Sequence, residues 1–226
     1  MPRKSRPLDR TTGLVRDSSI VVIACEDTHA VKQYFAKFRT RRVQFKVLPT
    51  EEGYSSPKAV VERLNRYRME EQIGDEDELW ICIDADHWIR GSHQRELAEV
   101  LRQCRSNGYC VAISNPCFEV WLLLHFVTID DELLNTILGN AQNSTVSESD
   151  RQSIRCDGFE EHLRIVSGGY NKTNVGRLPI TTLEVIQAMQ RARELDNGTG
   201  DIPGAPGTRA YKLLDTLKRR DFIVLE

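Results

Sequence analysis

The chain has 226 residues, of which 40% are hydrophobic and 28% are charged, the composition of a folded globular protein. These proportions exclude a disordered or fibrous chain. Thirty-one lysines and arginines stand against 33 aspartates and glutamates, and the net charge is −2. This balance excludes nucleic-acid binding driven by bulk charge, but it leaves room for a local basic face.

Strands and helices alternate in the first half of the chain. Short apolar segments predict strands at residues 19–25, 43–48, 78–83 and 109–113. Apolar residues at three-to-four spacing predict helices between them, at residues 28–39, 56–71 and 92–105. This order is typical of right-handed βαβ units, so we expect an α/β fold with a parallel four-stranded sheet and helices on both faces.

The pattern changes after residue 115. Residues 117–126 are apolar nearly all round and predict a buried helix, with Trp121 in the core. Loops are expected at residues 140–150, 167–177 and 197–207, helices at 159–166, 179–195 and 208–219, and a last strand at 222–225. The chain therefore divides into a flexible basic arm (1–17), an α/β core (18–127) and a mostly helical C-terminal region packed on that core (128–226).

Neither a membrane span nor a structural zinc site is expected. The longest apolar runs, residues 20–25 and 120–127, are far shorter than the roughly 20 residues that cross a bilayer. The basic N-terminus has no apolar stretch of a secretory signal, and the six cysteines form no Cys-x-x-Cys pair. We therefore expect a cytoplasmic protein with reduced cysteines.

Acidic residues follow two of the predicted strands. Glu26 comes directly after the first strand, and Asp84 and Asp86 follow the third. Ligands of open parallel sheets bind outside the carboxyl ends of the strands, and residues i and i+2 of an extended segment point the same way. Carboxylate oxygens suit Mg²⁺ or Mn²⁺. The alternative is a pair of solvated acids in a strand-to-helix turn.

The sequence resembles a known family at several motifs. The acids after the first and third strands resemble the metal-binding pattern of the Toprim fold, which occurs in primases, topoisomerases and several nucleases. Residues 114–126, SNPCFEVWLLLHF, are similar to the signature of the RloB-like proteins, a Toprim-related group. Residues 25–35, Tyr170 with Lys172, and residues 205–208 resemble further motifs of that family.

The resemblance implies a function in bacterial anti-phage defence. RloB-like proteins are encoded beside an AAA- or ABC-type ATPase, and related Toprim effectors cut nucleic acid, including tRNA. Two departures bear on this expectation. The family usually has a second glutamate in its first loop, where this chain has Val31, and the acid that often follows Asp-x-Asp is His87 here.

Three further residues have two interpretations each. Glu119 either reaches the metal-bearing edge of the sheet or is a first-turn acid favoured by the helix dipole. Lys172 either supplies positive charge to a pentavalent phosphate or is a solvated loop lysine. His87 either donates a proton to a leaving group or only hydrogen-bonds an aspartate. Asn115 and Pro116 are expected to shape the turn into the next helix.

A nucleic-acid surface requires cations, and two basic clusters can supply them. The first contains Lys37, Arg39, Arg41, Arg42 and Lys46, and the second Lys218, Arg219 and Arg220. The first cluster either follows phosphates or only stabilises the C-terminal end of a helix.

Three functions follow from these motifs. The first is a Mg²⁺-dependent nuclease, the toxic effector of a defence pair, with Glu26, Asp84 and Asp86 as metal ligands. The second is a regulatory module of the ATPase that has lost turnover, which Val31 favours. The third is another phosphoryl-transfer enzyme, such as a primase or phosphatase. The chain has no Gly-x-x-x-x-Gly-Lys-[Ser/Thr] loop, so it is not expected to be the ATPase itself.

Overall fold

A computed structural model describes residues 18–38, 40–50, 54–89, 93–139, 145–196 and 198–220. The predicted basic arm, the strand at 222–225 and Arg39 lie outside the described residues. Across these segments, no helix is long and apolar enough to span a membrane.

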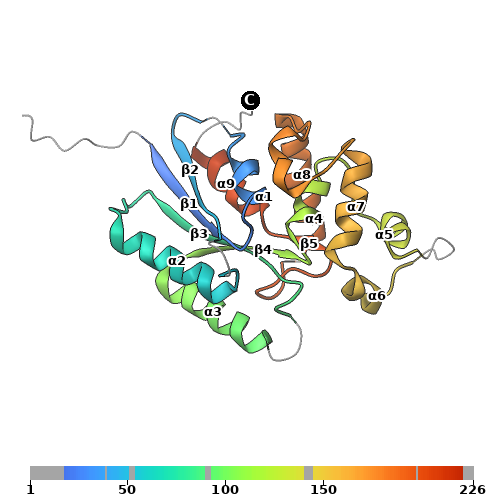
Figure 1. The fold of residues 1–226 in the computed structure, drawn as a ribbon, viewed down its shortest axis with the longest axis horizontal. Coiled ribbons are helices and arrows are strands. Elements are labelled where there is room, and N and C mark those ends of the chain that lie inside the picture. Colours follow the sequence, from blue (N-terminus) through green and yellow to red (C-terminus); the bar gives the residue numbers. More distant parts are fainter. Residues whose placement is uncertain are drawn as a thin grey trace, which may run out of the picture.

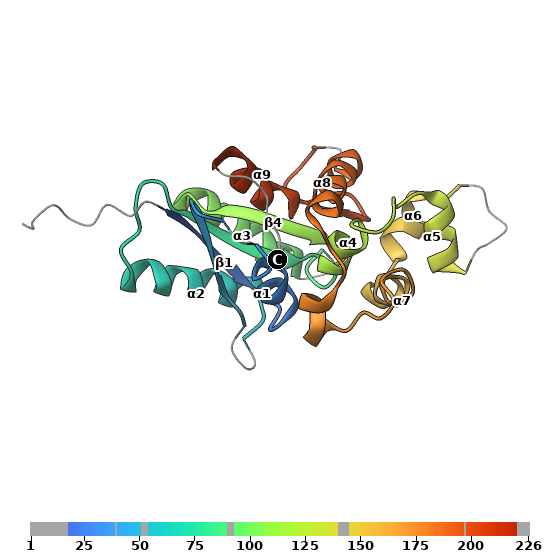
Figure 2. The same cartoon turned by 90° about the horizontal axis from the view of Figure 1, so that it is seen from above.

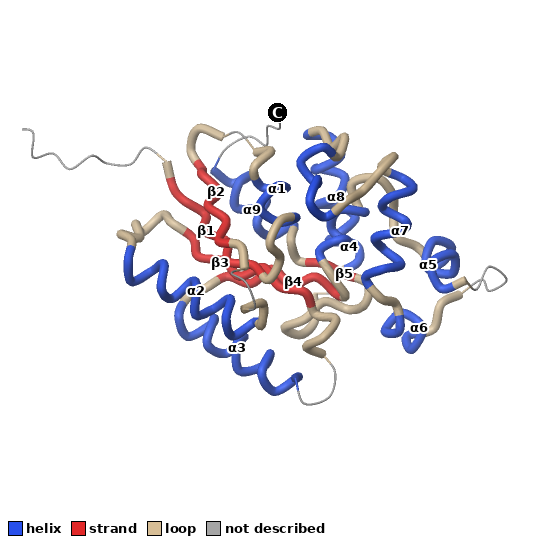
Figure 3. The backbone as a smooth tube through the Cα atoms, in the orientation of Figure 1, coloured by secondary structure: helices blue, strands red, loops and turns tan. Residues whose placement is uncertain are grey.

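The centre of the fold is a five-stranded sheet in the order β2-β1-β3-β4-β5 (Figure 3). Its strands are β1 (Ser19–Cys25), β2 (Val43–Leu48), β3 (Glu78–Asp84), β4 (Cys110–Asn115) and β5 (Gly207–Thr208). The first four are parallel, as predicted. The prediction of a four-stranded sheet was wrong, because β5 pairs antiparallel with the end of β4. Two residues inside a Gly- and Pro-rich stretch carry no strand periodicity that would reveal them.

Helices cover both faces of the sheet (Figure 1). On one face lie α2 (Pro57–Glu70) and α3 (His93–Asn107), which pack on Val22, Ala24 and their neighbours. On the other lies α1 (Ala30–Phe35), packed on Val21, Ile23 and Cys25. Successive strand residues point to opposite faces, so β1 contributes to two separate apolar cores.

The second half of the chain is mostly helical. Its helices are α4 (Phe118–Leu123), α5 (Asp131–Leu138), α6 (Glu148–Ser153), α7 (Cys156–Val166), the 3₁₀ helix η1 (Lys172–Arg177), α8 (Thr182–Leu195) and α9 (Tyr211–Arg220). Figure 2 shows α5, α6 and α7 grouped at one end of the molecule. The apolar residues of α4, α7, α8 and α9 join the same core as α1.

Several predicted boundaries in this half were wrong. The helix expected at 208–219 begins at Tyr211, after β5, and η1 lies in the stretch expected to be a loop. The loop expected at residues 140–150 contains the start of α6, and α5 was not predicted. Both short helices depend on caps: the Asp130 side chain accepts from the Leu133 N–H, and Ser147 forms a capping box with Asp150.

The buried helix α4 is shorter than predicted because His125 intervenes. His125 Nδ1 lies 2.9 Å from the Trp121 carbonyl oxygen, so this nitrogen carries the hydrogen and donates it. Nε2 is then the acceptor for the Tyr34 hydroxyl at 3.0 Å. The His125 ring thus donates to a backbone carbonyl of α4 and accepts from Tyr34 of α1, which links the two helices inside the core.

Stability is expected to fall in mild acid because of His125. Burial lowers the pKa of His125 from 6.5 to about 4. His125 therefore binds a proton near pH 6.5 in the unfolded chain but only near pH 4 in the folded chain. Stability is lost as the pH falls through this window. We expect a loss of about 2 kcal/mol between pH 7 and pH 5 from this group.

Urea unfolding of wild type, His125→Gln and His29→Gln at both pH values tests this expectation. His125→Gln should lack the loss, whereas His29→Gln, which changes an exposed histidine, should keep it. Equal pH dependence in all three proteins would contradict a neutral, buried His125.

Candidate metal and phosphate site

Acidic side chains gather at the carboxyl edge of the parallel strands. Glu26 follows β1, Asp84 is the last residue of β3, and Asp86 lies two residues further on. Backbone hydrogen bonds hold the Asp84–Asp86 segment against the end of β4. The Ala85 N–H donates to the Ser114 and Pro116 carbonyl oxygens at 2.8 and 3.0 Å, and the Asp86 N–H donates to Pro116 at 3.1 Å.

Glu26 is the least satisfied polar group at this edge. Its Oε1 atom is buried and has no hydrogen-bond partner. Burial raises the pKa of Glu26 to about 8, and the charge of Asp86 adds to the rise, although a hydrogen bond from the Trp88 side chain and the charge of Arg63 act in the opposite direction. A carboxylate in this environment is costly without a cation.

Asp84 lies between two other carboxylates. Burial raises the pKa of Asp84 well above its usual value, and the charges of Glu119 and Glu26 raise it further. Glu119 is the second residue of α4, and its side chain is 3% exposed. Glu119 is thus an acid of the first helical turn, and it also lies close enough to Asp84 for its charge to act on that carboxyl.

Glu119 is held by Tyr170 and Lys172. The Tyr170 hydroxyl donates to Glu119 Oε1 at 2.6 Å. Lys172 Nζ lies 3.4 Å from the same oxygen and 2.7 Å from Glu160 Oε1. Burial alone would lower the pKa of Lys172, but these two glutamates raise it above its usual value. Lys172 is therefore paired with two carboxylates beside the acidic edge, while 48% of its side chain stays exposed to solvent.

Asp86 and His87 lie on the outer side of the cluster. Asp86 Oδ2 is 3.4 Å from His87 Nε2 and accepts a hydrogen bond from Cys156 Sγ at 3.4 Å. The His87 side chain is 77% exposed. It contacts an aspartate and also faces solvent, so both interpretations of His87 stay predictions.

Two residues of the first loop and helix, Asp27 and Val31, have structural functions. Asp27 Oδ1 accepts from the backbone N–H groups of His29, Ala30 and Val31 and so caps α1. Val31 is 2% exposed in the apolar core. This position therefore supplies packing to the fold and no polar group to the acidic edge.

The donor set fits a hard divalent cation. Carboxylate oxygens are the ligands that Mg²⁺ prefers, and the orphaned Oε1 of Glu26 is an oxygen that a cation would satisfy. Within the described segments, no three His, Cys, Asp or Glu side chains already stand together as a formed metal site. Binding would therefore require the carboxylates to draw together around the ion.

Lys37, Lys46 and Arg219 of the two predicted basic clusters make contacts within the fold. Lys37 Nζ donates to the carbonyl oxygens of Gly176 and Leu178 at 3.0 and 2.9 Å, which ties α1 to η1. Lys46 lies 3.5 Å from Glu71 and over the Tyr67 ring. Arg219 lies 3.7 Å from Glu78, the first residue of β3, and so at the opposite edge of the sheet from Glu26.

A family model decides the relationship of this chain to known proteins. The model described as RloB-like protein matches residues 21–217, which include every strand and helix described above except the first two residues of β1 and the last three of α9. The chain belongs to the RloB-like family. No curated protein and no solved structure matches it. The function proposed for this RloB-like protein therefore rests on the geometry of its site.

Two residues of the site were not found from the sequence. Arg63 of α2 is 8% exposed, and its Nη2 donates to the Cys25 carbonyl oxygen at 2.9 Å, directly before Glu26. Trp88 hydrogen-bonds Glu26 from the loop after β3. The position of Arg63 between Val60 and Leu64, on the apolar face of its helix, is the signal that could have revealed it.

Proposed function

We propose that this RloB-like protein is a Mg²⁺- or Mn²⁺-dependent nuclease that hydrolyses phosphodiester bonds in RNA or DNA. The observation that carries the proposal is the buried, unpartnered Oε1 of Glu26 beside Asp84 and Asp86. Bringing carboxylates together in a buried position lowers the stability of the fold, and groups with pKa values shifted in this way are concentrated at functional sites. The parallel sheet with acids at its carboxyl edge also supports a Toprim-like architecture.

In this proposal Glu26, Asp84 and Asp86 hold the cation. The cation supplies Lewis-acid activation of the scissile phosphate and a water of lowered pKa. Lys172, fixed between Glu119 and Glu160, provides a positive charge to the phosphoryl oxygens. Glu119 acts as a positioning residue for Lys172, and the Tyr170 hydroxyl holds Glu119 in place by a hydrogen bond.

His87 is the proposed proton donor to the leaving oxygen. Its ring lies beside Asp86 and faces solvent, so a substrate on this edge can reach it. We further propose that the protein acts in the cytoplasm as the effector of an anti-phage pair with an AAA- or ABC-type ATPase. Six free cysteines suit that reducing compartment.

A cleavage assay with purified protein and its ATPase partner tests the proposal. Labelled tRNA, single-stranded RNA and duplex DNA are incubated in Mg²⁺, Mn²⁺ or EDTA. We expect cleavage in either metal, none in EDTA, and a loss of at least about a hundredfold in Asp84→Asn. Cleavage that persists at the wild-type rate in Asp84→Asn would contradict the assigned site. A protein that binds the ATPase but neither cleaves nor binds metal would be a regulatory subunit instead.

A further inference from the structure

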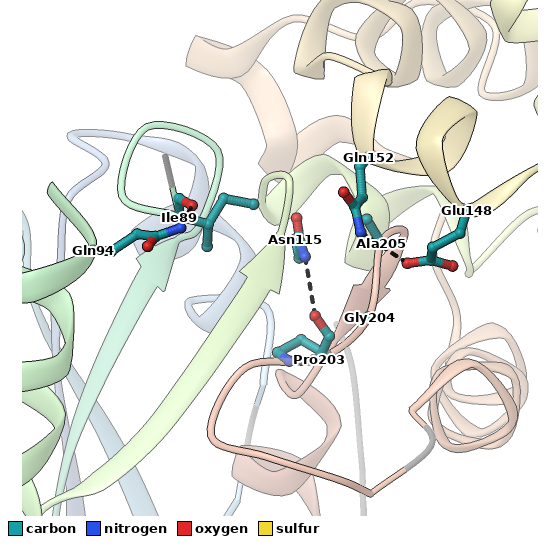
Figure 4. Close-up of a pocket in the computed structure, with 8 residues that line it drawn as sticks. All are labelled: Ile89, Gln94, Asn115, Glu148, Gln152, Pro203, Gly204 and Ala205. Carbon is teal, nitrogen blue, oxygen red and sulfur yellow. Dashed lines mark hydrogen bonds between the residues drawn. The ribbon is translucent and has the colours of Figure 1, made fainter. Parts of the chain in front are cut away.

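A pocket of about 350 Å³ opens beside the acidic edge (Figure 4). Asn115, the last residue of β4, lies in its wall, and the neighbouring Ser114 is paired with Asp84 of β3. Ile89, another wall residue, donates its backbone N–H to Ala85, between the two aspartates. The pocket and the carboxylates therefore share one loop. From the sequence pattern, Asn115 is expected only to shape the turn after β4.

Side-chain amides give the pocket its chemistry. Gln94, Asn115 and Gln152 come from three separate elements and each lines it. Asn115 Nδ2 donates to the Pro203 carbonyl oxygen at 3.0 Å, and Figure 4 shows its oxygen directed away from Pro203. An amide held in this way offers a fixed acceptor to a ligand. Amide side chains are the groups that pair with the edges of nucleobases.

The other lining groups restrict what can enter. Glu148 places a carboxylate at the rim, which repels a phosphate. Its Oε1 accepts a hydrogen bond from Gln152 Nε2 at 3.1 Å, and the remaining lone pairs of the carboxylate can accept from a neutral donor. Ile89 and Pro203 add apolar surface, on which a flat ring can pack. Gly204 leaves open space where a side chain would begin, because no atom lies within 4 Å of a Cβ built there. The ligand that fits is planar, uncharged and rich in hydrogen-bond donors.

We infer that this pocket binds an unpaired nucleobase of the substrate, and this inference rests on the proposed function. A base in a duplex cannot enter a pocket between loops, so the substrate is single-stranded or has a base turned out of its stack. Glu148 and the Asn115 oxygen both accept, so bases with an exocyclic amino group, adenine, cytosine and guanine, bind better than uracil.

Binding measurements in EDTA test the pocket without cleavage. The probes are 15-nucleotide single-stranded RNA and DNA followed by fluorescence anisotropy, the matching duplexes, and the four ribonucleosides followed by ligand-observed NMR. Gly204→Phe fills the pocket from the position that has open space. Gln152→Ala is a second variant that removes one amide. Gly74→Phe is the matched control, because Gly74 lines a different pocket on the loop before β3.

We expect single strands to bind at least about tenfold more tightly than duplexes, with uridine the weakest nucleoside. Gly204→Phe should weaken single-strand binding about tenfold and remove the nucleoside signals, and Gln152→Ala should weaken both. Gly74→Phe should match wild type. Wild-type binding of nucleosides by both pocket variants would overturn the inference.

The outcomes also separate this inference from the proposed function. Nucleoside binding that depends on the pocket, in a protein that never cleaves, would support the pocket and contradict the nuclease. Mg²⁺-dependent cleavage that Gly204→Phe leaves unchanged would support the nuclease and overturn the pocket. Loss of ATPase binding in Gly204→Phe, with no nucleoside binding by wild type, would overturn the inference by assigning the pocket to a protein partner.

Discussion

Replacement of Glu26 by glutamine is expected to abolish metal-dependent cleavage and at the same time to stabilise the metal-free protein. The rate should fall by at least about a hundredfold, because a metal ligand is lost. In EDTA at pH 7 to 8, the free energy of unfolding should rise by about 1–3 kcal/mol. Burial raises the pKa of Glu26 to about 8, so ionisation opposes folding as the pH rises, and glutamine removes that cost.

Urea unfolding in EDTA and a cleavage assay in Mg²⁺ measure the two effects on the same samples. Glu161→Gln is the control, because the Glu161 side chain is 63% exposed and pairs with a neighbouring arginine of α7 on the surface. This variant should change neither quantity appreciably. A Glu26→Gln protein that is less stable and still active would show that Glu26 serves the fold and not a metal.

Replacement of Arg209 by methionine is expected to cause the largest loss of stability, about 3–5 kcal/mol. Arg209 Nε and Nη2 lie 3.0 and 3.1 Å from the two carboxylate oxygens of Asp196. Its guanidinium also donates to the carbonyl oxygens of Thr199, Gly200 and Asp201. The Asp196 and Arg209 side chains are only 2% and 8% exposed, so methionine would leave a buried carboxylate and three carbonyls without this donor.

Arg105→Met is the matched control for Arg209. Arg105 lies 2.7 Å from Asp201 in the same loop, but both side chains are 57% exposed, and such pairs contribute at most about 1 kcal/mol. Urea unfolding of the two variants compares them directly. Equal stabilities would contradict the assignment of Arg209 as the residue whose hydrogen bonds to Asp196 and to the carbonyl oxygens of residues 199–201 stabilise this loop. Because Pro203 and Gly204 lie in that loop, Arg209→Met should also weaken nucleoside binding in the pocket.

The regular part of the fold was predictable from local sequence pattern. Continuous β-branched runs such as residues 19–25 and helices with clear apolar periodicity gave correct strands and a correct parallel arrangement. The errors lie where structure depends on single hydrogen bonds. Helices α5 and α6 are short and held by Asp130 and Ser147, and β5 is two residues paired with a distant strand. Apolar periodicity carries no information about such contacts.

The acids of the site were predictable because the ends of parallel strands meet at one edge. The contacts of those acids were not. Lys172 and Glu119 are 53 positions apart in the numbering, and their ion pair joins the start of η1 to the start of α4 only in the folded chain. Asn115 was assigned only to a turn, since its pocket is completed by Gln152 and Gly204 from remote segments. Tertiary packing, not spacing, brings these groups together.

The most direct test of the account is the binding of Mn²⁺ to the purified protein, followed by the loss of the free-ion signal in electron paramagnetic resonance. The carboxylate edge predicts saturable binding by wild type, weakened at least about tenfold in Asp84→Asn and in Glu26→Gln, but not in Glu161→Gln. Absence of Mn²⁺ binding by wild type, or equal affinity in all four proteins, would contradict a metal site at Glu26, Asp84 and Asp86.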